Sequence, residues 1–339
     1  MVNILLTNGL LIFILTLVIR HHKKIFLNDE NQIQNIHLGS VSRLGGCCIY
    51  IMAVLNSILN QDFVFFKIMI FCLLALLPAI MEDLSIKVRP IIRLFFITLS
   101  CITIVSSVEK LPILNFPLFF EFSNHYFFSL LFFSLCLAIL VNGQNMIDGS
   151  NGLSAISAAT TFGCLAYIGI IMDDVSLTYI SLTFISLVFS FLLFNYPFGK
   201  IFLGDTGSYF LGFITGYLVI KTYGKYEDLP TWSAAVILFY PSLEVIFSYI
   251  RKIIQGKSPF IADNEHLHIK IFYLLQSGSK VSVLYNALVA PFLAIIWITP
   301  LVAIPFLISF PKTSFLSMVI VVITYLFFYY SIPSPNKKH

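Results

Sequence analysis

The polar stretch GQNMIDGSNGL, residues 143–153, lies between two long apolar segments. In and just before it, amide and carboxylate side chains recur at every third position: Asn142, Asn145, Asp148 and Asn151. On a helix this spacing places the side chains on one face, and across a glycine-broken helix end it lets their oxygens converge. Hard cations such as Mg²⁺ prefer oxygen ligands, and amides can also bind a nucleobase edge. A turn alone needs only two or three such residues, so the stretch predicts a binding site.

A second acidic stretch, GDTGS at residues 204–208, stands immediately before another apolar segment. Glycines allow backbone N–H groups to approach an anion, and the start of the following helix favours negative charge there. The Asp205 carboxylate could then hold a cation that bridges such an anion. The alternative is an ordinary helix start, in which Thr206 or Ser208 caps the helix and Asp205 holds no ligand.

Charged residues also cluster in MEDLSIKVRPIIR, residues 81–93. Glu82 and Asp83 end one apolar segment, and Lys87 and Arg89 precede the next. Adjacent carboxylates beside cations can bind a metal ion or steer a phosphate group. The alternative is a solvated turn whose cations extend their charged ends into water.

Positive charge concentrates in residues 251–272, which include Arg251, His266 and His268. A His-x-His pair could belong to a zinc site, but no cysteine accompanies it and its neighbours are cationic. Anion recognition therefore fits better, with attraction to acidic lipid headgroups as the alternative. The lone Glu244 in the preceding apolar run is expected to face the protein interior and to pair with a cation or a polar loop.

The segment HLGSVSRLGG, residues 37–46, combines Arg43 with the glycine pair Gly45 and Gly46 before an apolar run. Close approach of the backbone to an anion would explain the two glycines. Helix punctuation explains them nearly as well. The segment is therefore a candidate anion-binding loop with Arg43 as its cation.

The elements that carry these stretches follow from composition. The 339-residue chain is 58% hydrophobic and only 11% charged, with a mean hydropathy of +0.93, whereas soluble domains carry about 25% charged residues. A helix needs about 20 apolar residues to cross a bilayer, fewer when flanking side chains snorkel. The chain is thus predicted to be an all-α polytopic membrane protein, one integral membrane domain over residues 1–339. About eleven transmembrane helices are expected, over residues 4–19, 44–60, 67–81, 91–108, 127–141, 153–171, 177–194, 209–222, 232–250, 283–309 and 315–331.

The distribution of basic residues predicts the orientation. With the N-terminus outside and the C-terminus in the cytoplasm, the cytoplasmic segments hold 15 of the chain's 20 Lys and Arg residues, as the positive-inside rule requires. All the polar stretches then lie on the cytoplasmic face, which predicts one assembled active site. These candidate catalytic loops are residues 37–46, 82–93, 142–153, 195–208 and 251–272.

Taken together and in this order, the stretches resemble the polyprenyl-phosphate N-acetylhexosamine-1-phosphate transferase family (glycosyltransferase family 4). That family carries a PRxGG segment, an Asp-Asp doublet, an NxxNxxDGxDGL segment, a GDTGS segment and a His-rich loop. The resemblance covers residues 37–272 and is closest to the undecaprenyl-phosphate antigen-initiating branch, whose SPF...D..HLHH pattern is similar to residues 258–269.

The chain departs from the family pattern at four positions. Ser42 stands for the proline of PRxGG, Glu82 for the first Asp of the doublet, Asn151 for the second Asp of DGxDGL, and Ile269 for the last His of HLHH. Glu82 keeps a carboxylate with a longer reach. The eukaryotic relative that acts on dolichol phosphate also carries Asn at the position of Asn151, so Asn at this position is compatible with activity.

The resemblance implies transfer of an N-acetylhexosamine-1-phosphate from a UDP-sugar to undecaprenyl phosphate, with release of UMP. The product would be a lipid-diphosphate sugar that initiates O-antigen or another cell-envelope polysaccharide. The implied setting is the bacterial cytoplasmic (inner) membrane, with membrane lipid as a partner, no nucleic acid, and a homodimer as an open alternative. The competing hypothesis is a secondary transporter whose polar helix-end residues line a substrate path.

The resemblance also implies a role for each candidate residue. Mg²⁺, with Mn²⁺ as an alternative, would be held by Asp205, Asp148 and Asn145. The catalytic residues would be Glu82, Asp83 and Asp148. The substrate-binding residues would be Arg43, Lys87, Arg89, Asn142, Asn145, Asn151, Arg251, His266 and His268.

Overall fold

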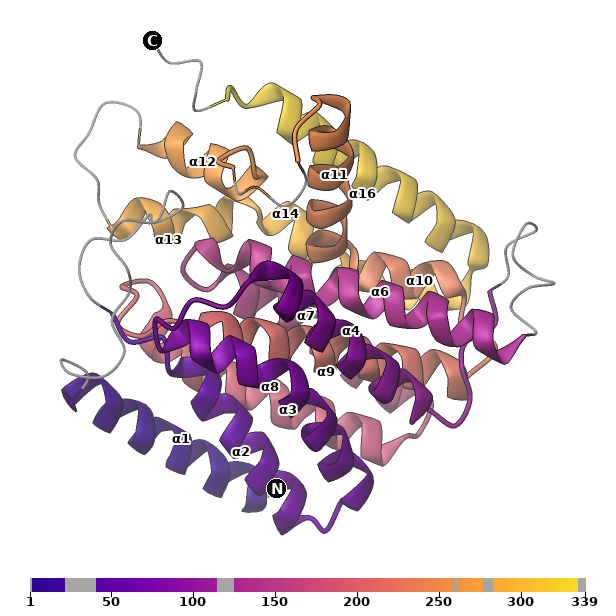
Figure 1. The fold of residues 1–339 in the computed structure, drawn as a ribbon. Coiled ribbons are helices and arrows are strands. Elements are labelled where there is room, and N and C mark those ends of the chain that lie inside the picture. Colours follow the sequence, from indigo (N-terminus) through magenta and orange to yellow (C-terminus); the bar gives the residue numbers. More distant parts are fainter. Residues whose placement is uncertain are drawn as a thin grey trace.

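The computed structural model describes residues 2–21, 41–114, 125–258, 261, 263–276 and 283–334, and within these ranges the regular secondary structure is helical (Figure 1). Residues 37–40 of the predicted anion-binding loop lie outside the described ranges. The helices are α1 (Val2–His21), α2 (Gly45–Leu59), α3 (Phe63–Asp83), α4 (Pro90–Ser106), α6 (Tyr126–Met146), the 3-10 turn η2 (Ile147–Gly149), α7 (Leu153–Ile171), α8 (Val175–Asn195), α9 (Gly204–Lys225), α10 (Thr231–Ile237), α11 (Phe239–Ile254), α12 (Leu267–Leu275), α13 (Val283–Phe292), α14 (Ala294–Trp297), α15 (Thr299–Ser309) and α16 (Pro311–Ser331).

The helices confirm a multi-pass membrane protein. Six of the described helices are long and apolar enough to cross a bilayer, and eight if each of two bent helix pairs counts as one span. The shorter apolar helices α2 and α4 have 15 and 17 residues. Each of the eleven predicted segments is helical in the structure, while the number of membrane crossings stays a prediction.

The predicted span over residues 232–250 is two helices rather than one. Helices α10 and α11 meet at 81° after Ile237. Pro241, in the first turn of α11, has no N–H to donate to the Ile237 carbonyl and its ring would clash with that carbonyl. The Thr161 hydroxyl of α7 donates to the freed Ile237 oxygen at 3.4 Å. Composition does not reveal this break, because both halves are apolar.

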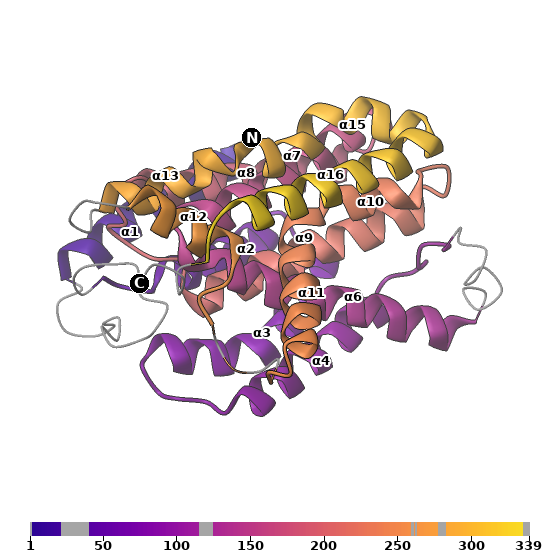
Figure 2. The same ribbon diagram turned by 90° about the horizontal axis from the view of Figure 1, so that it is seen from above.

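Helix α9 lies at the centre of the bundle (Figure 1), and nearly all of its residues are buried. It packs against α2, α3, α6 and α7, while α13 and α16 lie on the opposite side of the molecule from α3 (Figure 1 and Figure 2). Glycines allow this close packing, since small residues let helix backbones approach in membrane proteins. Where α2 meets α9, a Cβ atom added to Gly46 of α2 would lie 2.1 Å from the Gly207 Cα atom of α9.

We predict that Gly46→Ala lowers the free energy of unfolding by about 3 kcal/mol, because the new methyl group would meet backbone atoms that cannot move aside. Gly9→Ala is the matched control, since no atom lies within 4 Å of a Cβ at Gly9. Thermal unfolding of both variants in detergent checks this. Equal unfolding temperatures for the two variants would show that the α2–α9 contact is not close.

Candidate active site

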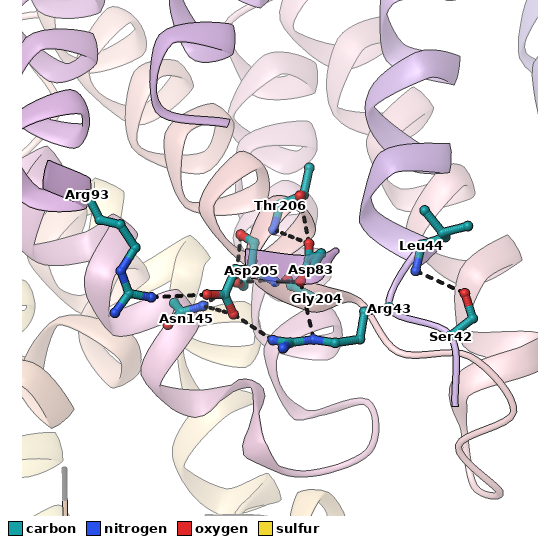
Figure 3. Close-up of polar contacts among 10 residues, drawn as sticks. Ser42, Arg43, Leu44, Asp83, Arg93, Asn145, Gly204, Asp205 and Thr206 are labelled. Carbon is teal, nitrogen blue, oxygen red and sulfur yellow. Dashed lines mark hydrogen bonds and ion pairs between the residues drawn. The ribbon is translucent and has the colours of Figure 1, made fainter. Parts of the chain in front are cut away.

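Asp205, in the first turn of α9, joins side chains from three other parts of the chain (Figure 3). Its Oδ1 accepts hydrogen bonds from Arg43 Nη2 at 2.8 Å and from Asn145 Nδ2 at 3.1 Å. Its Oδ2 lies 3.3 Å from Arg93 Nη1 of α4. These three contacts confirm the predicted meeting of four segments, residues 37–46, 82–93, 142–153 and 195–208.

Asp83, the last residue of α3, caps the N-terminus of α9. Its Oδ1 accepts from Asp205 N at 2.9 Å, and its Oδ2 accepts from Thr206 N at 2.9 Å and from Thr206 Oγ1 at 2.7 Å (Figure 3). The side chain is only 1% exposed. The first N–H groups of a helix have no partner within the helix, and a carboxylate satisfies them well. Asp83 thus holds the turn that carries Asp205.

Arg43 bridges the two carboxylates, with its Nε 3.2 Å from Asp83 Oδ1 and its Nη2 on Asp205. Burial opposes the charged guanidinium, but Asp205, Asp83 and then Asp148 outweigh it and raise the pKa of Arg43. Arg43 is therefore a permanent cation within an acidic cluster.

Backbone pairing holds the Arg43 segment in place. Gly45 N donates to Phe202 O at 3.0 Å, Gly46 N donates to Leu203 O at 2.8 Å, and Phe202 N donates to Ser42 O at 2.8 Å. Both glycines serve contacts within the protein, since a Cβ at Gly45 would lie 2.4 Å from the Phe191 ring. Close helix packing explains the glycine pair without a bound anion.

The Asn142–Asn151 stretch divides its side chains among different roles. Asn145 at the end of α6 donates its amide to Asp205 and, at 2.9 Å, to Ser208 Oγ. Asn142 donates to the Ala138 carbonyl of its own helix. Asp148 in η2 is partly exposed, and within the described residues its carboxylate has no hydrogen bond or ion pair with protein atoms. Asp148 is therefore available to a ligand.

The turn that follows Asp148 is buried and held from elsewhere. Asn151 is 2% exposed, and its Nδ2 donates to the Pro197 carbonyl at 2.9 Å. Asn151 N donates to Asn286 Oδ1 of α13 at 2.5 Å, and Asn286 Nδ2 donates to the Gly149 carbonyl at 3.4 Å. The sequence analysis missed Asn286, although a lone amide inside an apolar segment is a signal of an interior contact.

A second polar cluster surrounds Glu244 on the inner face of α11. Glu244 Oε1 lies 3.2 Å from His266 Nδ1 and accepts from Leu267 N at 3.0 Å, while Oε2 accepts from the Tyr325 hydroxyl at 3.0 Å. The prediction that Glu244 faces the interior and pairs with a cation or a polar loop is confirmed. This carboxylate fixes the start of α12 and links it to α16.

Arg251, seven residues after Glu244 on the same helix, belongs to this cluster. Its Nη2 lies 3.0 Å from Asp263 Oδ2. Burial opposes the charged Asp263 carboxylate, but Arg251 and then Lys252 lower the pKa of Asp263 below its usual value. The Nε and Nη1 atoms of Arg251 are buried and lack a partner within the described residues. Half of this guanidinium is thus free to bind an anion.

His268 packs directly against Gly149, the residue after Asp148: a Cβ atom added to Gly149 would lie only 2.9 Å from His268 Nε2. His268 therefore links the Glu244 cluster to the turn that carries Asp148. Burial lowers the pKa of His268 to about 4, despite the neighbouring Glu244. The imidazole is therefore neutral near pH 7 in this structure, and it offers a hydrogen bond rather than a charge. Its buried Nδ1 has no partner within the described residues.

Three predicted residues lie at the edge of the site. Lys87 and Arg89 are exposed in the loop between α3 and α4, and Glu82 is half-buried with Oε1 accepting from Val88 N at 2.6 Å. The cation of this region that reaches the acidic cluster is Arg93, in the first turn of α4. The sequence analysis did not distinguish it from its exposed neighbours.

The cluster fits a hard cation by its donor chemistry. No group of three or more His, Cys, Asp or Glu side chains in the described ranges could hold a metal ion by itself. The carboxylates of Asp148 and Asp205 with the amide of Asn145 nevertheless supply the oxygen ligands that Mg²⁺ prefers, with no thiolate or imidazole needed. A cation at Asp205 would replace a guanidinium contact from Arg43 or Arg93.

Comparison with known proteins gives consistent matches. Residues 65–223 match the family model described as glycosyl transferase family 4. A probable undecaprenyl-phosphate N-acetylglucosaminyl 1-phosphate transferase of Bacillus subtilis is 26% identical over 272 residues, 77% of this chain and 74% of that protein. An undecaprenyl-phosphate alpha-N-acetylglucosaminyl 1-phosphate transferase of Yersinia pestis is 23% identical over 72% of this chain and 69% of that protein. A protein of the same name from Thermotoga maritima is 29% identical over 40% of this chain and 41% of that protein.

The role of Asp83 as the cap of α9 leads to a stability prediction. Asp83→Asn should lower the free energy of unfolding by about 1–3 kcal/mol, because one carboxylate oxygen becomes an NH₂ group that faces a backbone N–H. Glu82→Gln is the control, since glutamine can still accept from Val88 N. Thermal unfolding in detergent checks both variants, and an unchanged Asp83→Asn protein would contradict the capping role.

Proposed function

Because the chain belongs to glycosyl transferase family 4, we propose that it transfers an N-acetylhexosamine-1-phosphate from a UDP-sugar to undecaprenyl phosphate. The products are UMP and a lipid-diphosphate sugar. The observation that carries this proposal is the joining of Asp83, Asn145 and Asp205 with two arginines at one set of helix ends. A cluster of carboxylates and guanidinium groups of this kind suits the transfer of a sugar phosphate between two anionic substrates.

Charge repulsion is the main obstacle to this reaction. Two like unit charges about 4 Å apart repel by roughly 4 kcal/mol at an effective dielectric constant near 20. Arg251 can reduce this repulsion, because its Nε and Nη1 are buried without partners. Together with His266 and His268 it would bind the diphosphate of the nucleotide. Lys87 and Arg89, exposed beside the cluster, would attract the lipid phosphate.

Magnesium belongs to the proposal, with Asp148, Asp205 and Asn145 as its ligands. When bound, Mg²⁺ would stabilise the negative charge that develops on the departing UMP. The protein side chains would perform the remaining steps. Arg43 and Arg93 position Asp205, and Asp83 holds the backbone of the same turn.

Asp148 is the best-placed acid–base residue. The carboxylates of Asp83 and Asp205 are occupied by donors from the protein, and Glu82 accepts from Val88 N. Asp148 is partly exposed and unpaired within the described residues. A carboxylate in that state can accept a proton from the lipid phosphate or orient it for in-line attack. We therefore assign Asp83 a positioning role and give the proton transfer to the Asp148 carboxylate oxygen that does not hold Mg²⁺.

An apolar cavity could hold the polyprenyl chain of the acceptor lipid. A cavity of about 320 Å³ lies between α6, α9, α10 and α11, and its lining is almost entirely apolar. It follows α6 from Phe132 to Leu140, between roughly three and a half and one and a half turns before Asn145. A polyprenyl chain could occupy it while the phosphate reaches the polar cluster. The sharp bend between α10 and α11 shapes one wall of this cavity.

The proposed setting is the inner membrane of a bacterium, with the cluster facing the cytoplasm where nucleotide sugars occur. The distribution of basic residues supports this orientation. A transporter is less well supported, because its ionisable groups would be expected near the bilayer midplane. Here Asp83, Asn145 and Asp205 stand at or within one turn of helix ends.

Purified protein in detergent or membranes, supplied with undecaprenyl phosphate, Mg²⁺ and a panel of UDP-N-acetylhexosamines, tests the activity. UDP-GlcNAc comes first, since the relatives carry N-acetylglucosaminyl in their names. We expect release of UMP and a radiolabelled sugar in the organic phase. Absence of lipid-linked sugar with every donor, together with solute uptake into liposomes, would replace the enzyme with a transporter.

The role of Asp148 gives a sharper prediction. Asp148→Asn should reduce kcat by about 10²- to 10⁴-fold while the protein stays folded, because the amide cannot accept the proton. Asp173→Asn is the matched control: Asp173 is an exposed Asp at the opposite end of α7 whose φ of 51° asparagine tolerates well. Initial rates of UMP release by the two variants check this prediction. Wild-type turnover by Asp148→Asn would remove Asp148 from the reaction.

A further inference from the structure

Asn286 of α13 contacts the turn that carries Asp148 on both sides of Ser150. The Asn286 side chain is fully buried. Its Oδ1 accepts from Asn151 N, and its Nδ2 donates to the Gly149 carbonyl. One carboxamide thus satisfies a buried backbone donor and a backbone acceptor only two residues apart. A carboxamide suits this place because it has an acceptor at one end and a donor at the other.

We propose that Asn286 is a positioning residue that fixes the Gly149–Asn151 turn and thereby the direction of the Asp148 carboxylate. This inference rests on the proposed function only for the catalytic role of Asp148. Among the described residues, the hydrogen bonds of Asn286 to this turn go to backbone atoms of Gly149 and Asn151, so Asn286 acts through the backbone of the turn. Asp148 has no protein partner of its own among the described residues, and the backbone that bears it therefore sets its position.

The rest of the turn supports this assignment. The Asn151 amide holds the Pro197 carbonyl, and His268 packs against Gly149 so closely that a Cβ atom there would lie 2.9 Å from Nε2. The turn is therefore enclosed by the loop after α8, by α12 and by α13. Of the contacts made by these three elements, those of Asn286 bind the backbone on both sides of Ser150.

The position of Asn286 makes this inference specific. Asn286 is 135 residues away from Asn151 in the sequence and lies beyond residues 65–223, which match the family model. The C-terminal third of the chain thus supplies a support for the acidic cluster in addition to membrane helices. Without Asn286, the buried Asn151 N–H would lose its partner, and the turn would rearrange to find another.

The test compares Asn286→Leu with Asn56→Leu. Both replace one buried Asn, but Asn56 lies in the last turn of α2, at the end of that helix remote from Gly45 and Arg43. We expect Asn286→Leu to lower kcat by about ten- to a hundredfold, the range found when supporting residues of a site are removed, with KM for the UDP-sugar changed less than about threefold. Asn56→Leu should keep wild-type kcat.

Hydrogen exchange of residues 147–152 gives a second readout that does not depend on activity. The Asn151 amide should exchange at least about tenfold faster in Asn286→Leu, while its protection should persist in Asn286→Asp, whose side chain can still accept this hydrogen bond. Unchanged exchange in Asn286→Leu, or an equal loss of kcat in Asn56→Leu, would overturn the proposal.

The two readouts also separate this inference from the proposed function. A wild-type protein without transferase activity would end the proposed function and with it the catalytic role of Asp148. Exchange in the 147–152 turn would still decide whether Asn286 holds the backbone. Faster exchange of the turn in Asn286→Leu together with wild-type kcat would show that the hydrogen bonds of Asn286 do not affect catalysis. This result would also overturn the proposal.

Discussion

The N-terminus of α9 lies inside the protein, and its first N–H groups need acceptors that water cannot supply there. Asp83 provides them with both carboxylate oxygens, and this one interaction joins the end of α3 to the start of α9. Arg43 then pairs with Asp83 and with Asp205, so the segment before α2 is placed as well. The position of Asp205 is thus a consequence of how a buried helix end is satisfied.

The helices and the common site at their ends could be predicted from the sequence, because local residue patterns determine them. Runs of apolar residues predict helices, and polar residues at alternate helix ends predict one common site. The packing partners of α9 could not be predicted, since the fit of Gly46 against Gly207 depends on the distance between two helices. The break before Pro241 was also missed, although proline inside an apolar run is a known cause of bending.

The individual roles of the polar residues were harder to predict than their assembly. Asp83 and Asp148 look alike in sequence, yet Asp83 is occupied by four donors and Asp148 is unpaired within the described residues. Asn151 donates its side-chain amide to the Pro197 carbonyl inside the protein, so its predicted role in binding substrate stays a prediction. Spacing reveals which residues can converge, but burial and hydrogen-bond partners decide which of them remain available to a ligand.

The arginines connect the folded state to ligand binding. Arg43 and Arg93 neutralise Asp205 in this structure, where the acidic side chains would otherwise repel one another. A guanidinium that turns toward a phosphate group must release part of its contact with the carboxylate. Binding of an anion would therefore expose the carboxylate oxygens to a cation, and a cation at Asp205 would free the guanidinium for the anion. We expect the two to bind cooperatively, because each removes the partner that competes with the other.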